Sequence, residues 1–134
     1  MQKPWVKRGA AAAALLALAY LLYPYAEVGR VWYGITGIDV SHHQGAIDWP
    51  RVKSAGVAFA YIKATEGGDF VDPDFRTNWD AAHAAGIPRG AYHFFRQCKS
   101  GLEQAKNFIA TVPVDALALP PVLDAEHMGP CPDG

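Results

Sequence analysis

Two acidic residues near the end of the sequence have a spacing that suits carboxylate chemistry. Asp124 and Glu126 follow the apolar run LPPVL and are separated by a single residue. On an extended strand, side chains two positions apart leave the same face, and their Cα atoms lie roughly 6.5 Å apart. This spacing predicts two carboxyl groups that act together at one site.

A repeating pattern of strands and helices would position these carboxyl groups. Strands are expected at residues 33–41, 57–65, 89–95 and 121–126, and helices at residues 48–56, 74–85 and 100–111. Asp48 and Ser100 are placed as helix N-caps, and Gly56 and Gly86 as helix stops. Repeated strand–helix–strand units predict a parallel α/β sheet, either open or closed as a barrel.

Ionisable side chains gather at the C-terminal ends of the predicted strands. They are Asp39, Lys63, Glu66, His93, Asp124 and Glu126. Because the C-terminal ends of parallel strands meet at one rim, four strands are expected to direct these groups at the same place. The predicted site lies at this rim.

The motifs at the rim resemble, in order and spacing, those of the family 25 glycoside hydrolases, the N,O-diacetylmuramidase-type lysozymes. The matching segments are GIDVSHHQGAIDW, YIKATEGGDFVD, GAYHFF and PPVLDAE, and the resemblance runs from about Gly34 to Glu126. It implies a TIM-like (β/α) barrel that needs no cofactor. It also implies cleavage of the bond between N-acetylmuramic acid and N-acetylglucosamine in peptidoglycan.

The resemblance assigns roles to seven residues. Glu126 matches the general acid, Asp124 the central carboxylate beside it, and Asp39 an aspartate that lines the same cleft. Positions that shape the cleft floor and the substrate site are matched by Lys63, Glu66, Tyr92 and His93. Glycosidic cleavage normally needs one protonated and one ionised carboxyl group, and crowded carboxylates keep one of their number protonated near neutral pH. Attack by a side chain and attack by the substrate's acetamido oxygen both stay open.

Structural explanations compete with these roles. Lys63 and Glu66 fit a structural ion pair equally well, and Trp49 and Trp79 fit the core better than a sugar platform. His83 is expected to pack on a helix. A metal site is not expected, because the histidines and cysteines lack the spacings of metal ligands.

The first 32 residues are expected to form a segment separate from a catalytic domain at residues 33–134. Lys3, Lys7 and Arg8 precede an uncharged run of 18 residues, Gly9–Ala26, which indicates an export signal or a membrane anchor. An uncleaved transmembrane signal-anchor is favoured, because no A-x-A cleavage site follows the run. The basic flank keeps its N-terminus cytoplasmic, so the domain would face the periplasm or cell exterior in both cases.

The amino-acid composition limits the classes of partner that the chain is expected to bind. The chain has a net charge of -1 and 51% hydrophobic residues, which is typical of a globular protein. No basic block suggests nucleic acid, so peptidoglycan glycan strands and the membrane are the expected partners. Cys98 and Cys131 fit either a disulfide in an exported domain or two free thiols.

The predicted domain is short for a closed barrel. About 100 residues follow the N-terminal segment, whereas a closed (β/α) barrel usually needs roughly 200 or more. We therefore expect only the first half to two-thirds of a barrel, with an exposed fourth strand that favours self-association. The alternative function is an inactive truncated or membrane-anchored peptidoglycan-binding remnant.

Overall fold

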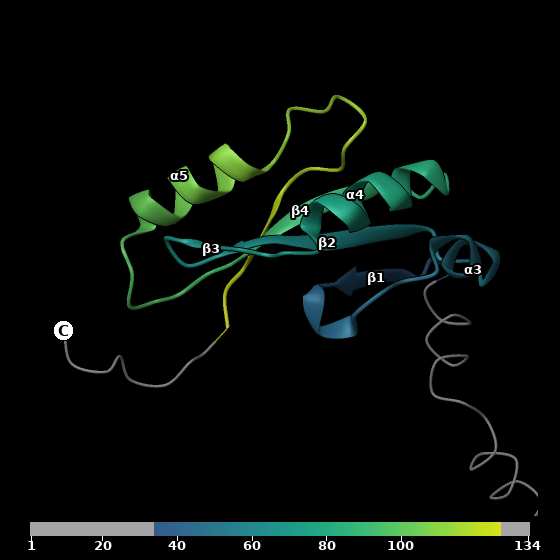
Figure 1. Cartoon of the computed structure of the whole chain (residues 1–134), viewed down its shortest axis with the longest axis horizontal. Helices are drawn as coiled ribbons and strands as arrows, with labels where there is room; N and C mark the ends of the chain where they lie inside the picture. The colour runs from purple at the N-terminus through teal and green to yellow at the C-terminus, as the bar shows by residue number, and fades with distance from the viewer. Residues whose placement is uncertain (1–33, 127–134) are drawn as a thin grey trace, which may run out of the picture. The chain divides into compact units, whose positions relative to one another are not determined.

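The computed structural model describes residues 34–126, of which residues 36–126 belong to one compact unit. Four parallel strands form a sheet in the order β1-β2-β4-β5, and a short β3 pairs antiparallel with β2 (Figure 1). The strands are β1 (Gly37–Val40), β2 (Phe59–Glu66), β3 (Phe70–Val71), β4 (Arg89–Phe94) and β5 (Val122–Asp124). The helices are η1 (His42–Gln44), α3 (Trp49–Ser54), α4 (Phe75–Ala84) and α5 (Gly101–Thr111).

The predicted order of strands and helices is confirmed, with differences at the element ends. The Asp48 carboxylate caps α3 by accepting from the Arg51 amide at 3.1 Å, and the Ser100 hydroxyl caps α5 by accepting from the Glu103 amide at 3.4 Å. The expected strand at 121–126 is shorter than predicted, because β5 ends at Asp124. The strand β3 was not predicted.

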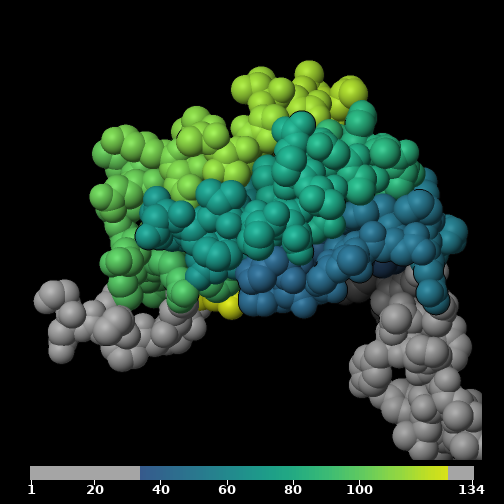
Figure 2. Space-filling view, in the orientation of Figure 1, coloured from purple at the N-terminus to yellow at the C-terminus, as the bar shows by residue number. Residues whose placement is uncertain are grey.

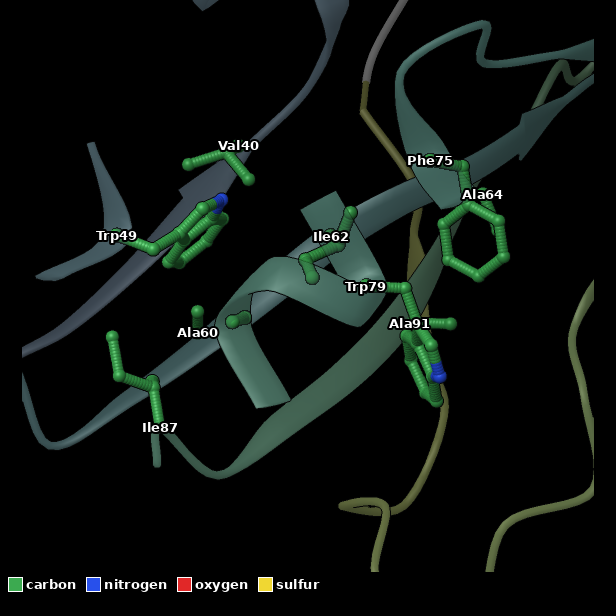
Figure 3. Packing of buried hydrophobic residues seen from close by; sticks show 10 residues of the cluster. Val40, Trp49, Ala60, Ile62, Ala64, Phe75, Trp79, Ile87 and Ala91 are labelled. Carbon is green, nitrogen blue, oxygen red and sulfur yellow. The ribbon is translucent and has the colours of Figure 1, made fainter. Parts of the chain in front are cut away.

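The core lies between the sheet and α4, where small strand residues face large helix residues. Ala60, Ala64 and Ala91 are buried on β2 and β4, so the Trp79 ring of α4 packs directly over the sheet (Figure 3). Trp49 fills the space beside β1 and donates through its indole N–H to the Asn78 side-chain oxygen at 3.1 Å. Both tryptophans are core residues, as predicted.

The opposite face of the sheet carries aromatic side chains over glycines. A Cβ atom added at Gly37 would lie 2.2 Å from the Phe59 ring, and one added at Gly90 would lie 2.3 Å from the Tyr61 ring. Side chains alternate between the two faces of a strand, so Lys63, two residues after Tyr61, also leaves this face. We call it the open face, because α4 and α5 lie on the other side of the sheet (Figure 1).

Within residues 34–126 the sheet stays open, since β1 and β5 each pair on one side only. It is therefore a partial barrel. A pocket of about 410 Å³ lies between α5 and β5, and the loop between these two elements projects from the surface with Val114 and Leu117 exposed (Figure 2). Across the described range, no helix is long and apolar enough to cross a bilayer. The predicted membrane segment lies outside this range.

Candidate active site

Asp39 and Asp124 lie on opposite edge strands of the sheet, and the charges of both affect the pKa of one tyrosine. Asp39 belongs to β1 and Asp124 is the last residue of β5, while Tyr92 lies between them on β4. Burial raises the pKa of Tyr92 to about 12, and the charges of Asp39, Asp124 and Asp72 add to this effect. A hydrogen bond with Ser41 lowers the pKa but does not offset the rise. Tyr92 is therefore a neutral phenol among carboxylates at physiological pH.

Glu126 lies two residues beyond the end of β5 and is exposed. Its backbone carbonyl accepts a hydrogen bond from the Gln97 side chain at 3.1 Å, which ties the segment to the loop after β4. The expectation that one continuous strand carries both Asp124 and Glu126 is thus not met. The role of Glu126 as the general acid stays a prediction.

Lys63 and Glu66 form an ion pair that a third residue completes. The Lys63 ammonium donates to Glu66 Oε2 at 2.5 Å, and Arg96 Nη2 lies 2.6 Å from Glu66 Oε1. Burial alone raises the pKa of Glu66, but the hydrogen bonds and charges of Lys63 and Arg96 outweigh burial and hold the pKa below its usual 4.5. The Lys63 ammonium also lies 4.8 Å from the centre of the Phe94 ring. This geometry supports a structural role under the cleft.

Replacing Glu66 by glutamine is expected to destabilise the fold by about 1.5–3 kcal/mol at pH 7, because the variant loses charged hydrogen bonds to a buried lysine. A lowered folded-state pKa contributes stability above the unfolded pKa and loses it as pH falls through the folded value. The difference in unfolding free energy between wild type and variant should therefore shrink below pH 4.5. Urea unfolding at pH 7 and at acidic pH measures it, and a difference independent of pH would contradict the assignment.

His93 does not reach the open face. It is buried on the helix side of the sheet, where Nδ1 lies 2.7 Å from Thr65 Oγ1 and Nε2 lies 3.0 Å from Gln104 Oε1. Tyr92 and His93 are neighbours on one strand, so their side chains leave opposite faces. The structure therefore brings Tyr92, but not His93, to the acidic residues, and His93 links β4 to α5.

Sequence reasoning gave no role to the pair formed by His42 and Asp72. The buried Asp72 carboxylate accepts from His42 Nδ1 at 2.8 Å and from the His42 amide at 3.0 Å. Ser41 and Gln44 form a capping box that holds η1 beside them. The S-x-x-Q spacing was the available signal for this turn, whereas nothing in the sequence paired positions 42 and 72.

Two smaller findings concern cysteine and metal chemistry. Cys98, in the loop after β4, is disulfide-bonded, and Cys131, the other cysteine of the sequence, lies outside the described residues. In the part of the chain from 34 to 126, no group of three or more His, Cys, Asp or Glu side chains could hold a metal ion.

Comparison with known proteins connects this geometry to a family. The profile of the glycosyl hydrolases family 25 matches residues 38–132. Lysozyme M1 of Streptomyces globisporus is 53% identical over 98 residues, which cover 70% of this chain and 33% of that protein. An N,O-diacetylmuramidase of a Chalaropsis species is 35% identical over 105 residues, which cover 73% of this chain and 50% of that protein.

A solved structure of a member of this family also matches the chain. The structure of a family 25 glycosyl hydrolase from Bacillus anthracis matches with a TM-score of 0.69 at 46% identity, covering 71% of this chain and 44% of that one. This chain thus spans half or less of the length of these relatives. Because the family profile matches most of the sequence and the sheet matches a family structure, the chain belongs to the glycosyl hydrolases family 25, as its motifs predicted.

Proposed function

We propose that this chain carries catalytic residues of a peptidoglycan hydrolase, a muramidase that cleaves the glycosidic bond between N-acetylmuramic acid and N-acetylglucosamine. The observation that carries the proposal is that Asp39 of β1 and Asp124 at the end of β5 both raise the pKa of Tyr92 through their charges. Family membership adds the reaction class, since glycoside hydrolases use carboxyl groups on either side of the bond they break.

The three acidic residues divide the work in this proposal. Glu126 donates a proton to the oxygen of the leaving sugar, so that this oxygen departs as a hydroxyl group. Asp124 stays ionised and stabilises the positive charge that develops on the sugar ring, and Asp39 lines the opposite side of the cleft. Tyr92, whose pKa is about 12, keeps its proton and supplies a hydrogen-bond donor among these carboxylates.

The test is hydrolysis of purified peptidoglycan by the full chain kept in mild detergent. New reducing ends are expected, and mass spectrometry of the reduced products is expected to find reduced N-acetylmuramic acid. Reduced N-acetylglucosamine alone would contradict the assigned bond. No release by a folded sample would contradict hydrolysis by this chain and favour a peptidoglycan-binding protein without turnover.

We further propose that a second copy of the chain covers the edge at β5. Val122 and Leu123 of β5 and Ile109 of α5 are exposed beside the apolar pocket between these elements. An uncovered strand edge with apolar neighbours favours association with another chain. Such association would also place a β-strand of the second copy next to β5, at the side of the cleft.

Leu123→Lys is expected to weaken this association at least about tenfold, because it places a charge on an edge strand where lysine opposes pairing. Sedimentation equilibrium of the full chain over a range of concentrations measures the dissociation constant. Thr77→Lys, which adds the same charge on the exposed side of α4, should leave it unchanged. A wild-type chain that is monomeric at every concentration would overturn the proposal.

The N-terminal segment, residues 1–32, is proposed to anchor the domain at residues 33–134 to the inner membrane. The basic flank followed by an apolar run of 18 residues supports this proposal. Cell fractionation tests it: the full chain should sediment with membranes and resist extraction by high salt, and recovery of a shortened soluble chain would favour cleavage instead.

A further inference from the structure

A second pocket differs in chemistry from the candidate catalytic residues, and none of Asp39, Asp124 and Glu126 belongs to its lining. It has a volume of about 490 Å³, and its lining includes His42, His43, Glu66, Phe70, Arg96 and Lys99. We call it the cation pocket. Its walls come from η1, from the β2–β3 hairpin and from the loop after β4, whereas the acidic residues come from β1 and β5.

Two carboxylates near the cation pocket, those of Glu66 and Asp72, already bind other groups of the protein. Glu66 uses Oε2 for Lys63 and Oε1 for Arg96, and Asp72 accepts from the His42 ring and amide. Lys63 and Arg96 offset the charge of Glu66, and the bonds to Asp72 fix the His42 ring at one wall. Glu66 therefore does little to repel an anion, and the other carboxylate of the pocket lining is Asp69 at the hairpin tip.

The cations of the pocket are accessible. The Arg96 side chain is 44% exposed although it pairs with Glu66. Lys99 is also exposed, and among the described residues it takes part in no ion pair. Arginine and lysine side chains bind carboxylates in proteins through charged hydrogen bonds.

Apolar surface accompanies these charges. The rings of His42 and Phe70 lie 5.6 Å apart, and those of His42 and His43 lie 4.0 Å apart. A ligand that carries a carboxylate and also packs against rings suits this lining better than an N-acetylglucosamine ring, which carries hydroxyl and acetamido groups but no charge.

We propose that the cation pocket binds a carboxylate of the peptide that substitutes the glycan strand, so that the chain prefers peptide-bearing glycan to bare glycan. The inference rests on the proposed function and names the part of the substrate that this pocket takes. The peptide site would also fix the direction in which the glycan strand runs through the cleft. The peptide carboxylates lie at Arg96 and Lys99, away from Asp39 and Asp124, which would repel them.

Binding of two probes by the full chain tests the inference. The background is Glu126→Gln, which keeps the glycan intact during the measurement. One probe is glycan strands that retain their peptides. The other is the same strands after an amidase has removed the peptides, which leaves a free lactyl carboxylate on each N-acetylmuramic acid, so the comparison tests for a carboxylate at the distance of the peptide. The peptide-bearing probe is expected to bind about tenfold more tightly, as one charged hydrogen bond predicts. The preference should shrink as salt rises.

Lys99→Gln tests the residue itself. It is expected to abolish most of the preference without changing affinity for bare strands, and Arg96→Lys should retain the preference because the charge is kept. Lys106→Gln on α5, an exposed lysine outside the pocket lining, is the matched control. Thermal melts verify that each variant is folded.

The outcomes separate this inference from the proposed function. Equal affinity for both probes, or a preference that survives Lys99→Gln, overturns the peptide site and leaves the proposed hydrolase intact. Failure to bind either probe overturns glycan recognition itself, and the peptide site with it. A preference that disappears in Lys99→Gln but remains in Arg96→Lys and Lys106→Gln supports the peptide site.

Discussion

Glu126→Gln is expected to slow release of reducing ends from peptidoglycan by about 10²–10⁴-fold, while binding of the glycan changes little. Glutamine has nearly the size and polarity of a protonated glutamate, but its amide has no acidic proton to donate. The leaving oxygen must then depart without protonation, which raises the barrier of that step alone. The expected loss is therefore in kcat rather than in KM.

Steady-state release of reducing ends at several substrate concentrations separates the two parameters. Glu103→Gln makes the same chemical change at an exposed position on α5 and should leave both unchanged. Residues that act as a unit are not additive, so the double variant Asp124→Asn, Glu126→Gln should lose little more than the more damaging single one. Wild-type kcat in Glu126→Gln would remove Glu126 from the general-acid role.

The sequence predicted the sheet well because its signals are local. Helix caps at Asp48 and Ser100 and alternating strands and helices each depend on a few neighbouring residues, and the structure has them where expected. The shared effect of Asp39 and Asp124 on Tyr92 followed from strand ends meeting at one rim. Parallel pairing makes that outcome a property of the fold class, so it needed no knowledge of individual contacts.

The position of His93 shows where motif reasoning departs from strand geometry. Tyr92 and His93 both match family positions, yet neighbouring residues on a strand face opposite sides. A register shift in β2 between Lys63 and Thr65 then brings Thr65 opposite His93 on the helix side. Such a bulge has no clear sequence signal, so the hydrogen bond between these two residues required the structure.

Long-range polar contacts were the other part that the sequence left open. His42 and Asp72 are 30 positions apart, and Glu66 and Arg96 also 30 apart. In the sequence alone, His42, Asp72 and Arg96 read as loop residues, and the partner considered for Glu66 was Lys63. The pairing depends on how the hairpin between β2 and β3 folds against η1 and the loop after β4, which tertiary packing decides.

Trp79→Ala is expected to destabilise the fold by about 3–5 kcal/mol, the range observed when a buried large aromatic residue is truncated. The Trp79 side chain is 2% exposed and packs on Phe75 with ring centres 5.4 Å apart. The Arg89 guanidinium lies 4.4 Å from the ring and would lose this contact. The cavity left between α4 and the sheet adds to the loss of apolar burial. Trp79→Phe refills part of it and should cost less.

The same variant separates a core tryptophan from a sugar platform. Trp79 lies on the helix side of the sheet, whereas the acidic residues, Tyr92 and Lys63 belong to the open face. Glycan binding and fold stability should therefore respond independently to Trp79→Ala. Since domains are stable by only about 5–15 kcal/mol, Trp79→Ala is studied at low temperature, where enough protein stays folded. Urea unfolding should give the large stability loss, and the folded fraction should bind glycan strands within about twofold of wild type, a difference well under 1.4 kcal/mol. Unchanged unfolding free energy with a tenfold loss of affinity would instead place the Trp79 ring against the sugar and contradict the packing on α4.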